Sequence, residues 1–164
     1  MELTSERLVY KKATNSDRSN FVSWYTNDVV MKFITGSALT NEEANTRFEK
    51  ALETNETYPE LGFYSAYKKD DNAFIGLVKL IYYKDSQAEI GYGLLPEFWS
   101  NKYATEMLRC FVNYSKSISK IKELIGIVDP NNVASKKVLT NQSFKFFKKG
   151  VEDNRPAEYF KLDL

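Results

Sequence analysis

The sequence contains no histidine and a single cysteine, Cys110. The absence of histidine excludes Ser-His and Cys-His catalytic pairs, the usual zinc sites and the commonest general base. One cysteine excludes an intramolecular disulfide and a thiolate metal cluster. Because Cys110 lies in an apparent helix, we interpret it as a small buried hydrophobic residue rather than a nucleophile. Proton transfer must therefore use carboxylates, tyrosine, serine, lysine or water, and we expect no metal site.

Long apolar runs and an excess of one charge are also missing. No run approaches the roughly 20 residues of a membrane span, and the polar start, residues 1–8, lacks the apolar segment of a signal peptide. A net charge of +1 gives no overall attraction to nucleic acid or anionic membranes. The cluster of Lys145, Lys148 and Lys149 is more typical of a solvated edge than of a nucleic-acid footprint. We expect a cytoplasmic protein that contacts neither nucleic acid nor membrane.

The chain is long enough, and rich enough in apolar residues, to bury a core. Its 164 residues are 43% hydrophobic and 15% aromatic, which argues against disorder and fits one domain over residues 1–164. Local patterns predict a series of elements. They are a strand over 7–12, a helix capped by Asn15 or Ser16 and ending near 25, a helix starting with the capping-box pattern Thr40–Glu43 and ending near 53, a hairpin of 63–67 and 73–82, a strand over 89–95, a helix over 102–116, a strand over 124–128, a helix over 133–141, and strands over 144–149 and 157–163. This order predicts an α/β (α+β) fold with a mixed sheet and helices on both faces.

Residues 88–108 carry the most information. An apolar strand stops at Pro96, a short polar turn follows, and a helix opens near Asn101. The first N–H groups of a helix have no partner within the helix, so such a turn is suited to binding an anion. The alternative is a plain helix cap that binds nothing.

Several motifs, in this order and spacing, resemble the GNAT acetyltransferases, and most of all their Rim-type branch, which acetylates protein N-termini. The motifs are Thr4–Leu8 with Asp17, Phe74–Gly76, Glu89–Tyr92, Trp99–Glu106, and Asn132–Ser135 followed by Val138, Leu139 and Phe144. The resemblance covers nearly the whole chain. It implies a central, mostly antiparallel sheet, acetyl-CoA as cosubstrate, a primary amine as acceptor, and direct transfer without a covalent enzyme intermediate.

The resemblance also implies which residues hold the cosubstrate. The turn would bind the pyrophosphate through Ser100, Asn101, Lys102, Tyr103, Ala104 and Thr105. The strand end would bind the pantetheine arm through backbone groups of Gly93, Leu94 and Leu95, one of which could also stabilise an oxyanion. Asn132 would cap the following helix, and could also bond the arm.

The turn departs from the family pattern, which places glycines where this chain has Ser100 and Lys102. Glycine adopts backbone conformations that strain other residues, and a loss of roughly 1–3 kcal/mol would weaken binding by one to two orders of magnitude. Lys102 could instead place its ammonium against the pyrophosphate as a point charge. We therefore expect cosubstrate binding that these substitutions can weaken.

Glu89 is the candidate general base. An amine attacks a thioester only when neutral, and amines with pKa values of roughly 8 to 10.4 are mostly charged at pH 7. Glu89 lies on the strand two residues before Gly91, on the same face as that glycine, and some Rim-type relatives use a glutamate at this spot. A solvated glutamate at a strand edge is the alternative.

Ser135 is the candidate acid that protonates the departing CoA thiolate. Many family members use a tyrosine four residues later, where this chain has Leu139. Ser135 lies one helical turn earlier on the same face and could bond the sulfur, although it could equally satisfy backbone groups in the first turn. The aromatic residues Trp24, Phe33, Tyr82 and Tyr83 are candidates for the acceptor pocket, or for the core.

Two other interpretations remain at this stage. One is a catalytically degenerate CoA-binding or regulatory protein of the same fold, which the altered turn suggests. The other is an interaction module with an unrelated fold. The acceptor, either a protein N-terminus or a small amine, cannot be chosen from the sequence, and the protein is expected to be a monomer or a homodimer.

Overall fold

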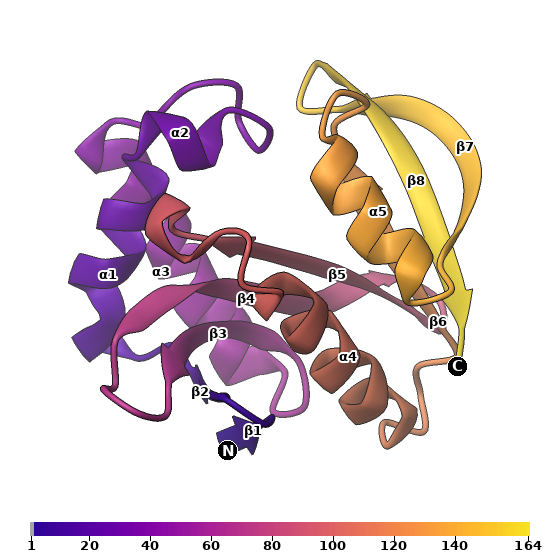
Figure 1. Cartoon of the computed structure of the whole chain (residues 1–164), viewed down its shortest axis with the longest axis horizontal. Coiled ribbons are helices and arrows are strands. Elements are labelled where there is room, and N and C mark those ends of the chain that lie inside the picture. Colours follow the sequence, from indigo (N-terminus) through magenta and orange to yellow (C-terminus); the bar gives the residue numbers. More distant parts are fainter. Residues whose placement is uncertain (1) are drawn as a thin grey trace.

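The computed structural model describes residues 2–164, which form an eight-stranded sheet in the order β1-β2-β3-β4-β5-β6-β8-β7 (Figure 1). The strands are β1 (Glu2–Thr4), β2 (Leu8–Lys12), β3 (Gly62–Lys68), β4 (Phe74–Lys84), β5 (Gln87–Leu94), β6 (Glu123–Val128), β7 (Lys145–Glu152) and β8 (Arg155–Asp163). The helices are α1 (Arg18–Tyr25), α2 (Asp28–Met31), α3 (Asn41–Thr57), α4 (Tyr103–Lys116) and α5 (Val133–Asn141), with 3-10 turns η1 (Asn15–Asp17) and η2 (Pro96–Phe98). Neighbouring strands are antiparallel except β5 and β6.

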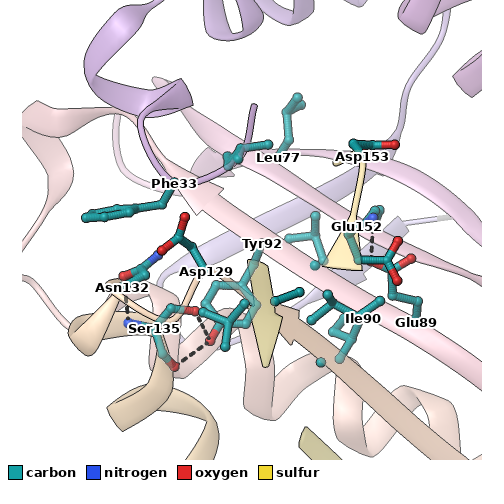
Figure 2. Close-up of a pocket in the computed structure, with 18 of the residues that line it drawn as sticks. Phe33, Leu77, Glu89, Ile90, Tyr92, Asp129, Asn132, Ser135, Glu152 and Asp153 are labelled. Atoms are coloured by element: carbon teal, nitrogen blue, oxygen red, sulfur yellow. Dashed lines mark hydrogen bonds and ion pairs between the residues drawn. The ribbon is translucent and has the colours of Figure 1, made fainter. Parts of the chain in front are cut away.

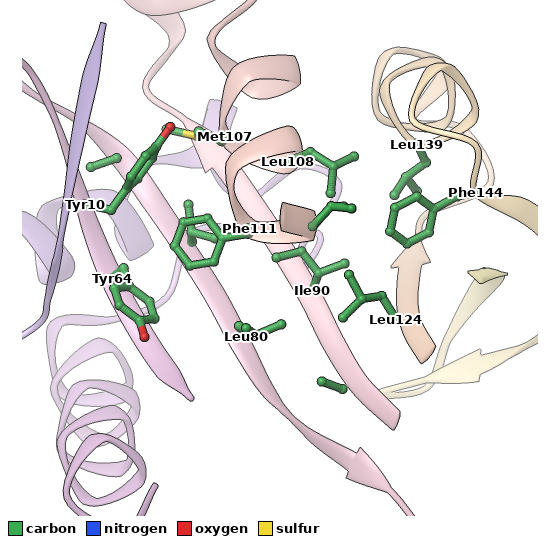
Figure 3. Packing of buried hydrophobic residues seen from close by; sticks show 14 of the residues in the cluster. Tyr10, Tyr64, Leu80, Ile90, Met107, Leu108, Phe111, Leu124, Leu139 and Phe144 are labelled. Carbon is green, nitrogen blue, oxygen red and sulfur yellow. The ribbon is translucent and has the colours of Figure 1, made fainter. Parts of the chain in front are cut away.

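Helices cover both faces of the sheet, with α4 and α5 on one face and α1 and α3 on the other (Figure 1). Apolar residues three and four apart give α4 a buried stripe that includes Met107 and Phe111. Phe111 is fully buried and makes edge contacts with Tyr10 and Tyr64 of the sheet (Figure 3). Removing such a side chain from water contributes about 1.5–3 kcal/mol. The predicted mixed sheet with helices on both faces is confirmed.

The N-terminal part differs from the sequence prediction. Two elements, β1 and α2, were not predicted, because three or four residues are too few to show a period. The first helix is capped neither by Asn15 nor by Ser16. It follows the turn η1, in which the Asp17 carboxylate accepts hydrogen bonds from the N–H and the hydroxyl of Thr14.

The capping box that starts α3 is confirmed. The Thr40 N–H donates to Glu43 Oε2 at 2.8 Å, and the Glu43 N–H donates to Thr40 Oγ1 at 3.2 Å. The helix runs to Thr57, beyond the predicted end near 53. The reason is Asn55, whose amide bonds the backbone of Ala13 and Phe63 and so attaches the last turns of α3 to the sheet.

The pairing of β5 opens a gap in the middle of the sheet. On one side, β5 pairs with β4 along its whole length, up to Leu94 opposite Gly76. On the other side, it pairs with β6 only from Gln87 to Glu89. Beyond Glu89 and its partner Ile125, the two strands separate. Because α4 follows β5 and α5 follows β6, the N-terminal ends of these helices lie near this gap (Figure 1).

Candidate functional site

One edge of β5 has backbone groups with no strand beside them. The Leu95 N–H donates to the Ile75 carbonyl of the β4 side at 2.8 Å, and Gly93 lies opposite Leu77. Since successive residues of a strand point their N–H groups to opposite sides, Gly93 and Leu95 face β4, and Tyr92 and Leu94 face the gap. The Leu94 carbonyl accepts a bond from Trp99 Nε1 at 2.9 Å. Of the three residues predicted to hold the arm, Leu94 is therefore the one whose N–H faces the gap.

The turn after β5 carries a row of unpaired N–H groups. The Trp99 N–H donates to the Pro96 carbonyl, and the next backbone bond comes from Glu106, whose N–H donates to the Lys102 carbonyl. Between them, the N–H groups of residues 100–105 have no acceptor within residues 2–164. Such a row at the positive end of α4, a helix of 14 residues, suits a ligand with several anionic oxygens.

The two positions where the family has glycine adopt the left-handed conformation. Ser100 and Lys102 each have φ of 63°, and Lys102 is the N-cap residue of α4. The intervening Asn101 holds the turn through its side-chain amide, which donates to the carbonyls of Phe98 at 3.3 Å and Trp99 at 2.8 Å. The turn thus keeps the backbone that glycines would favour, at a cost in strain. The side chains of Ser100 and Lys102 are exposed.

A cavity of about 400 Å³ lies where β5 and β6 separate (Figure 2). Its walls come from α1, the segment after α2, α3, strands β3 to β6, α5 and the β7–β8 hairpin. Three predicted site residues, Glu89, Asn132 and Ser135, line it. Of the predicted aromatic residues, Trp24 and Phe33 line it, whereas Tyr82 packs against Tyr58 and, within the described chain, neither Tyr82 nor Tyr83 belongs to the lining.

Glu89 is largely buried and holds an ion pair. Its side chain is 15% exposed, and its Oε1 lies 2.6 Å from Nζ of Lys79 on β4. The carboxylate therefore sits in the cavity with a cation beside it (Figure 2). It is not a solvated glutamate at a strand edge.

Ser135 contacts a residue that the sequence analysis did not single out. The hydroxyl of Tyr92 lies 3.3 Å from Ser135 Oγ and donates to the Ser135 carbonyl at the same distance (Figure 2). Burial raises the pKa of Tyr92 to about 12, so its hydroxyl stays protonated at neutral pH. Strand alternation could have found it, because Tyr92 is three residues from Glu89 and therefore faces the opposite side of β5. Leu139, at the position of the family tyrosine, is buried in the core.

Two polar side chains hold the walls of the cavity. The Asn132 side chain caps α5 as predicted, since its Oδ1 accepts from the Ser135 N–H at 3.1 Å. Arg155, at the start of β8, donates to Asp129 Oδ2 at 2.8 Å and to the Lys32 carbonyl at 3.3 Å. Arg155 thus links the C-terminal hairpin to the loop after α2. No sequence pattern indicated this contact.

No group of three or more Cys, Asp or Glu side chains is placed to hold a metal ion in residues 2–164. Over the same residues, no helix is long and apolar enough to cross a membrane.

Known proteins share this sequence pattern and this fold. Residues 7–145 match the acetyltransferase (GNAT) domain family. A Bacillus subtilis (strain 168) protein named "Uncharacterized N-acetyltransferase YoaA" is 27% identical over 157 residues, covering 91% of this chain and 84% of the relative. Solved structures with the same fold include two complexes with coenzyme A. One is RimL, the ribosomal L7/L12 alpha-N-protein acetyltransferase, in complex with coenzyme A (TM-score 0.85, 12% identity, 100% and 98% of the two chains). The other is spermidine N-acetyltransferase from Vibrio cholerae with CoA and spermine (TM-score 0.80, 16% identity, 96% and 95%).

The family match extends over the turn with its unpaired N–H groups, the gap between β5 and β6, and the capped start of α5. The resemblance noted from the sequence motifs is confirmed, and the chain belongs to the acetyltransferase (GNAT) domain family.

Proposed function

We propose that this protein, acting as one domain over residues 1–164, transfers the acetyl group of acetyl-CoA directly to a primary amine. The observation that carries the proposal is the row of unpaired N–H groups at residues 100–105, next to a gap that leads into a cavity. A pyrophosphate would satisfy those groups, and an extended arm in the gap would bond the free edge of β5. Two proteins of the same fold were solved with coenzyme A.

The residues then take separate roles. The backbone of Ser100, Asn101, Lys102, Tyr103, Ala104 and Thr105 would hold the pyrophosphate, and the exposed Lys102 would add a point charge. The Leu94 N–H would pair with the arm, with Gly93 and Leu95 forming the strand behind it. Asn132, which caps α5 beside the cavity, is placed to fix this helix and its Ser135.

The two candidate catalytic groups lie on different sides of β5. Glu89 faces the side of Lys79 and Trp24, and Ser135 comes from α5 on the side of Tyr92. Glu89 would accept the proton of the incoming ammonium, directly or through water, and the neutral nitrogen would attack the thioester carbon. The C–S bond then breaks, and Ser135 would donate a hydrogen bond or a proton to the thiolate. A thiolate with a pKa of about 8.5 leaves readily, so this second role is the less demanding one.

The acceptor is proposed only as a primary amine. Neighbours of the same fold act, by their names, on a protein N-terminus and on spermidine, so the fold serves both classes. A cytoplasmic location, expected from the sequence, is part of the same proposal.

The proposal is tested by binding first and turnover second. Calorimetric titration with CoA should show one site, and a free-thiol assay with acetyl-CoA and a panel of peptides, polyamines and amino acids should show release of CoA. Binding with no turnover of any amine would favour a degenerate binding protein of the same fold. No binding at all would reject the proposal.

A charge change in the turn tests where CoA binds. Lys102→Glu puts a carboxylate beside the N–H row, and Lys102→Gln is the matched neutral variant with the same backbone strain. Because position 102 is exposed, both variants should fold with nearly the wild-type melting temperature. We expect Lys102→Glu to weaken CoA binding more than about tenfold and Lys102→Gln less than that. Equal affinities for the two variants would place the pyrophosphate elsewhere.

A further inference from the structure

Lys79 is itself a primary amine, and it already sits beside the candidate base. Its Nζ lies 2.6 Å from Glu89 Oε1, inside the cavity where β5 and β6 separate. Its side chain is 34% exposed, so it is partly buried and still reachable from solvent. Figure 2 shows Glu89 pointing into this cavity, with its ion pair drawn as a dashed line.

The position of Lys79 depends on a missing side chain. Lys79 lies opposite Gly91 in the β4–β5 register, and Glu89 is two residues further along the same face. A Cβ on Gly91 would lie 2.7 Å from Lys79 Cε and 3.0 Å from its Cγ. Only glycine therefore lets the lysine stem lie flat across β5 and bring its nitrogen to Glu89. At the next residue on this face, Gly93, the ring of Trp24 fills the space, 2.5 Å from where a Cβ would be.

Lys79 is the one amine among the residues that line this cavity in the described chain. The other cations there are Arg47 and Arg155, whose guanidinium groups stay charged and do not act as nucleophiles. Arg155 is also engaged with Asp129. An amine next to a carboxylate that can take its proton, in the cavity that would hold the thioester, meets the requirements for an acceptor.

We propose that Lys79 is a site of self-acetylation, which occurs when acetyl-CoA is bound and no external amine occupies the cavity. The inference rests on the proposed function. The Lys79 ammonium gives a proton to Glu89, and its neutral nitrogen attacks the carbonyl carbon of the thioester. A C–N bond forms and the C–S bond breaks. The CoA thiolate is protonated, and one proton is released overall, leaving CoA thiol and an acetylated Lys79.

The modification changes the site in a defined way. An amide has no positive charge, so the ion pair with Glu89 is lost, and the carboxylate is left to act on an external ammonium. The added acetyl group also occupies space in the cavity near Glu89. Both effects alter how the site receives its acceptor.

The test is acetylation of the protein with acetyl-CoA alone, followed by peptide mass spectrometry. Lys84, on the same strand but exposed and outside the cavity lining of the described residues, is the internal control for chemical acetylation. We expect Lys79 to be labelled at least about tenfold faster than Lys84. Labelling of Lys79 should saturate with acetyl-CoA at the concentration that saturates binding, whereas labelling of Lys84 should rise linearly.

Two variants test whether Lys79 is acetylated by the proposed mechanism or only because its side chain is exposed. Glu89→Gln removes the proton acceptor, and Gly91→Ala moves the lysine stem, so each should slow labelling of Lys79 and leave that of Lys84 unchanged. The melting temperature of each variant shows that it is folded. Equal labelling of Lys79 and Lys84 in a protein that acetylates an added amine would overturn this inference alone. Failure to bind CoA, with no labelling, would reject the proposed function as well.

Discussion

Ser100 and Lys102 hold backbone conformations that glycine would adopt without strain. Both residues have φ of 63°. Both side chains are exposed, so neither side chain is needed to pack the core. A non-glycine residue in this conformation costs about 1–2 kcal/mol of stability. Glycine would avoid this strain, but it would lower stability by about 0.4–1 kcal/mol because it gives the unfolded chain more conformational entropy. The turn therefore keeps its shape at a net cost in stability.

Replacing either residue with glycine should stabilise the protein. For Ser100→Gly and Lys102→Gly we expect a gain of about 0.5–1 kcal/mol each, or about 2–3 °C in melting temperature, measured by calorimetry. Asn101→Gly is the contrasting variant, because it removes the amide that bonds Phe98 and Trp99 and should destabilise. A loss of stability in the first two variants would mean that the left-handed residues carry no strain.

Glu89 should matter most where the acceptor is charged. For Glu89→Gln we expect kcat to fall by about 10–100-fold at pH 7 and to recover as the pH rises toward the pKa of the amine, because a neutral amine needs no base. The measurement is a pH–rate profile with one amine at saturating acetyl-CoA. A profile that is lowered equally at every pH would remove Glu89 from proton transfer and leave it a structural role with Lys79.

At the scale of elements, caps and periods in the sequence predicted most of the fold. The box from Thr40 to Glu43 and the Asn132 cap are both formed, and the helix predicted over 102–116 is α4. Local patterns failed where a distant partner decides, as with Asn55, which extends α3 by bonding the sheet.

The candidate site shows the same limit. The sequence indicated Glu89, Ser135 and the turn, because each belongs to a local motif. It did not indicate Lys79 or Arg155, whose positions depend on contacts between distant segments. It also missed Tyr92, which strand alternation alone could have placed opposite Glu89. No sequence pattern could show which N–H groups of β5 face the gap, because this depends on the register of β5 with β4.

The start of α5 should depend on Asn132. Its Oδ1 satisfies the Ser135 N–H, so Asn132→Ala should cost about 1 kcal/mol and speed amide exchange at Ser135. The neighbouring Asn131, which is exposed and whose side chain has no hydrogen bond within the described residues, gives the control variant Asn131→Ala. An equal loss of stability in both variants would mean that the loss comes from removing an asparagine from this loop and not from removing the cap.

Across the whole molecule, the sheet consists of two parts that meet at three residue pairs. Strands β1 to β5 form one part and β6 to β8 the other, joined where Gln87, Ala88 and Glu89 pair with β6. The cavity lies where the two parts diverge, and Arg155 bridges it on the far side through Asp129 and the Lys32 carbonyl.

The buried Glu106 joins the N-terminal segment to α4, the helix that follows the turn with the unpaired N–H groups. It is 4% exposed, and it accepts bonds from the Ser5 hydroxyl, the Arg7 N–H and the Arg7 guanidinium, each at 2.7 Å. Burial raises the pKa of Glu106, but these three bonds outweigh it, and the pKa lies below its usual value. A carboxylate whose pKa is depressed on folding stabilises the protein above its unfolded pKa of about 4.3, and this contribution is lost as the pH falls through the folded pKa.

Glu106→Gln should therefore lower stability at pH 7 and flatten its dependence on pH. Because Arg7 is 42% exposed and its charge is screened, most of the effect should come from the other two bonds, about 1–3 kcal/mol in all. Melting temperatures measured from pH 7 to pH 3 should fall more steeply for the wild type than for the variant, so that the two curves converge in acid. Glu56→Gln, a change at an exposed position of α3, should leave both the stability and its slope unchanged. Parallel curves for wild type and Glu106→Gln would show that the carboxylate contributes no charge-dependent stability, and that α4 is held to the N-terminal strands by packing alone.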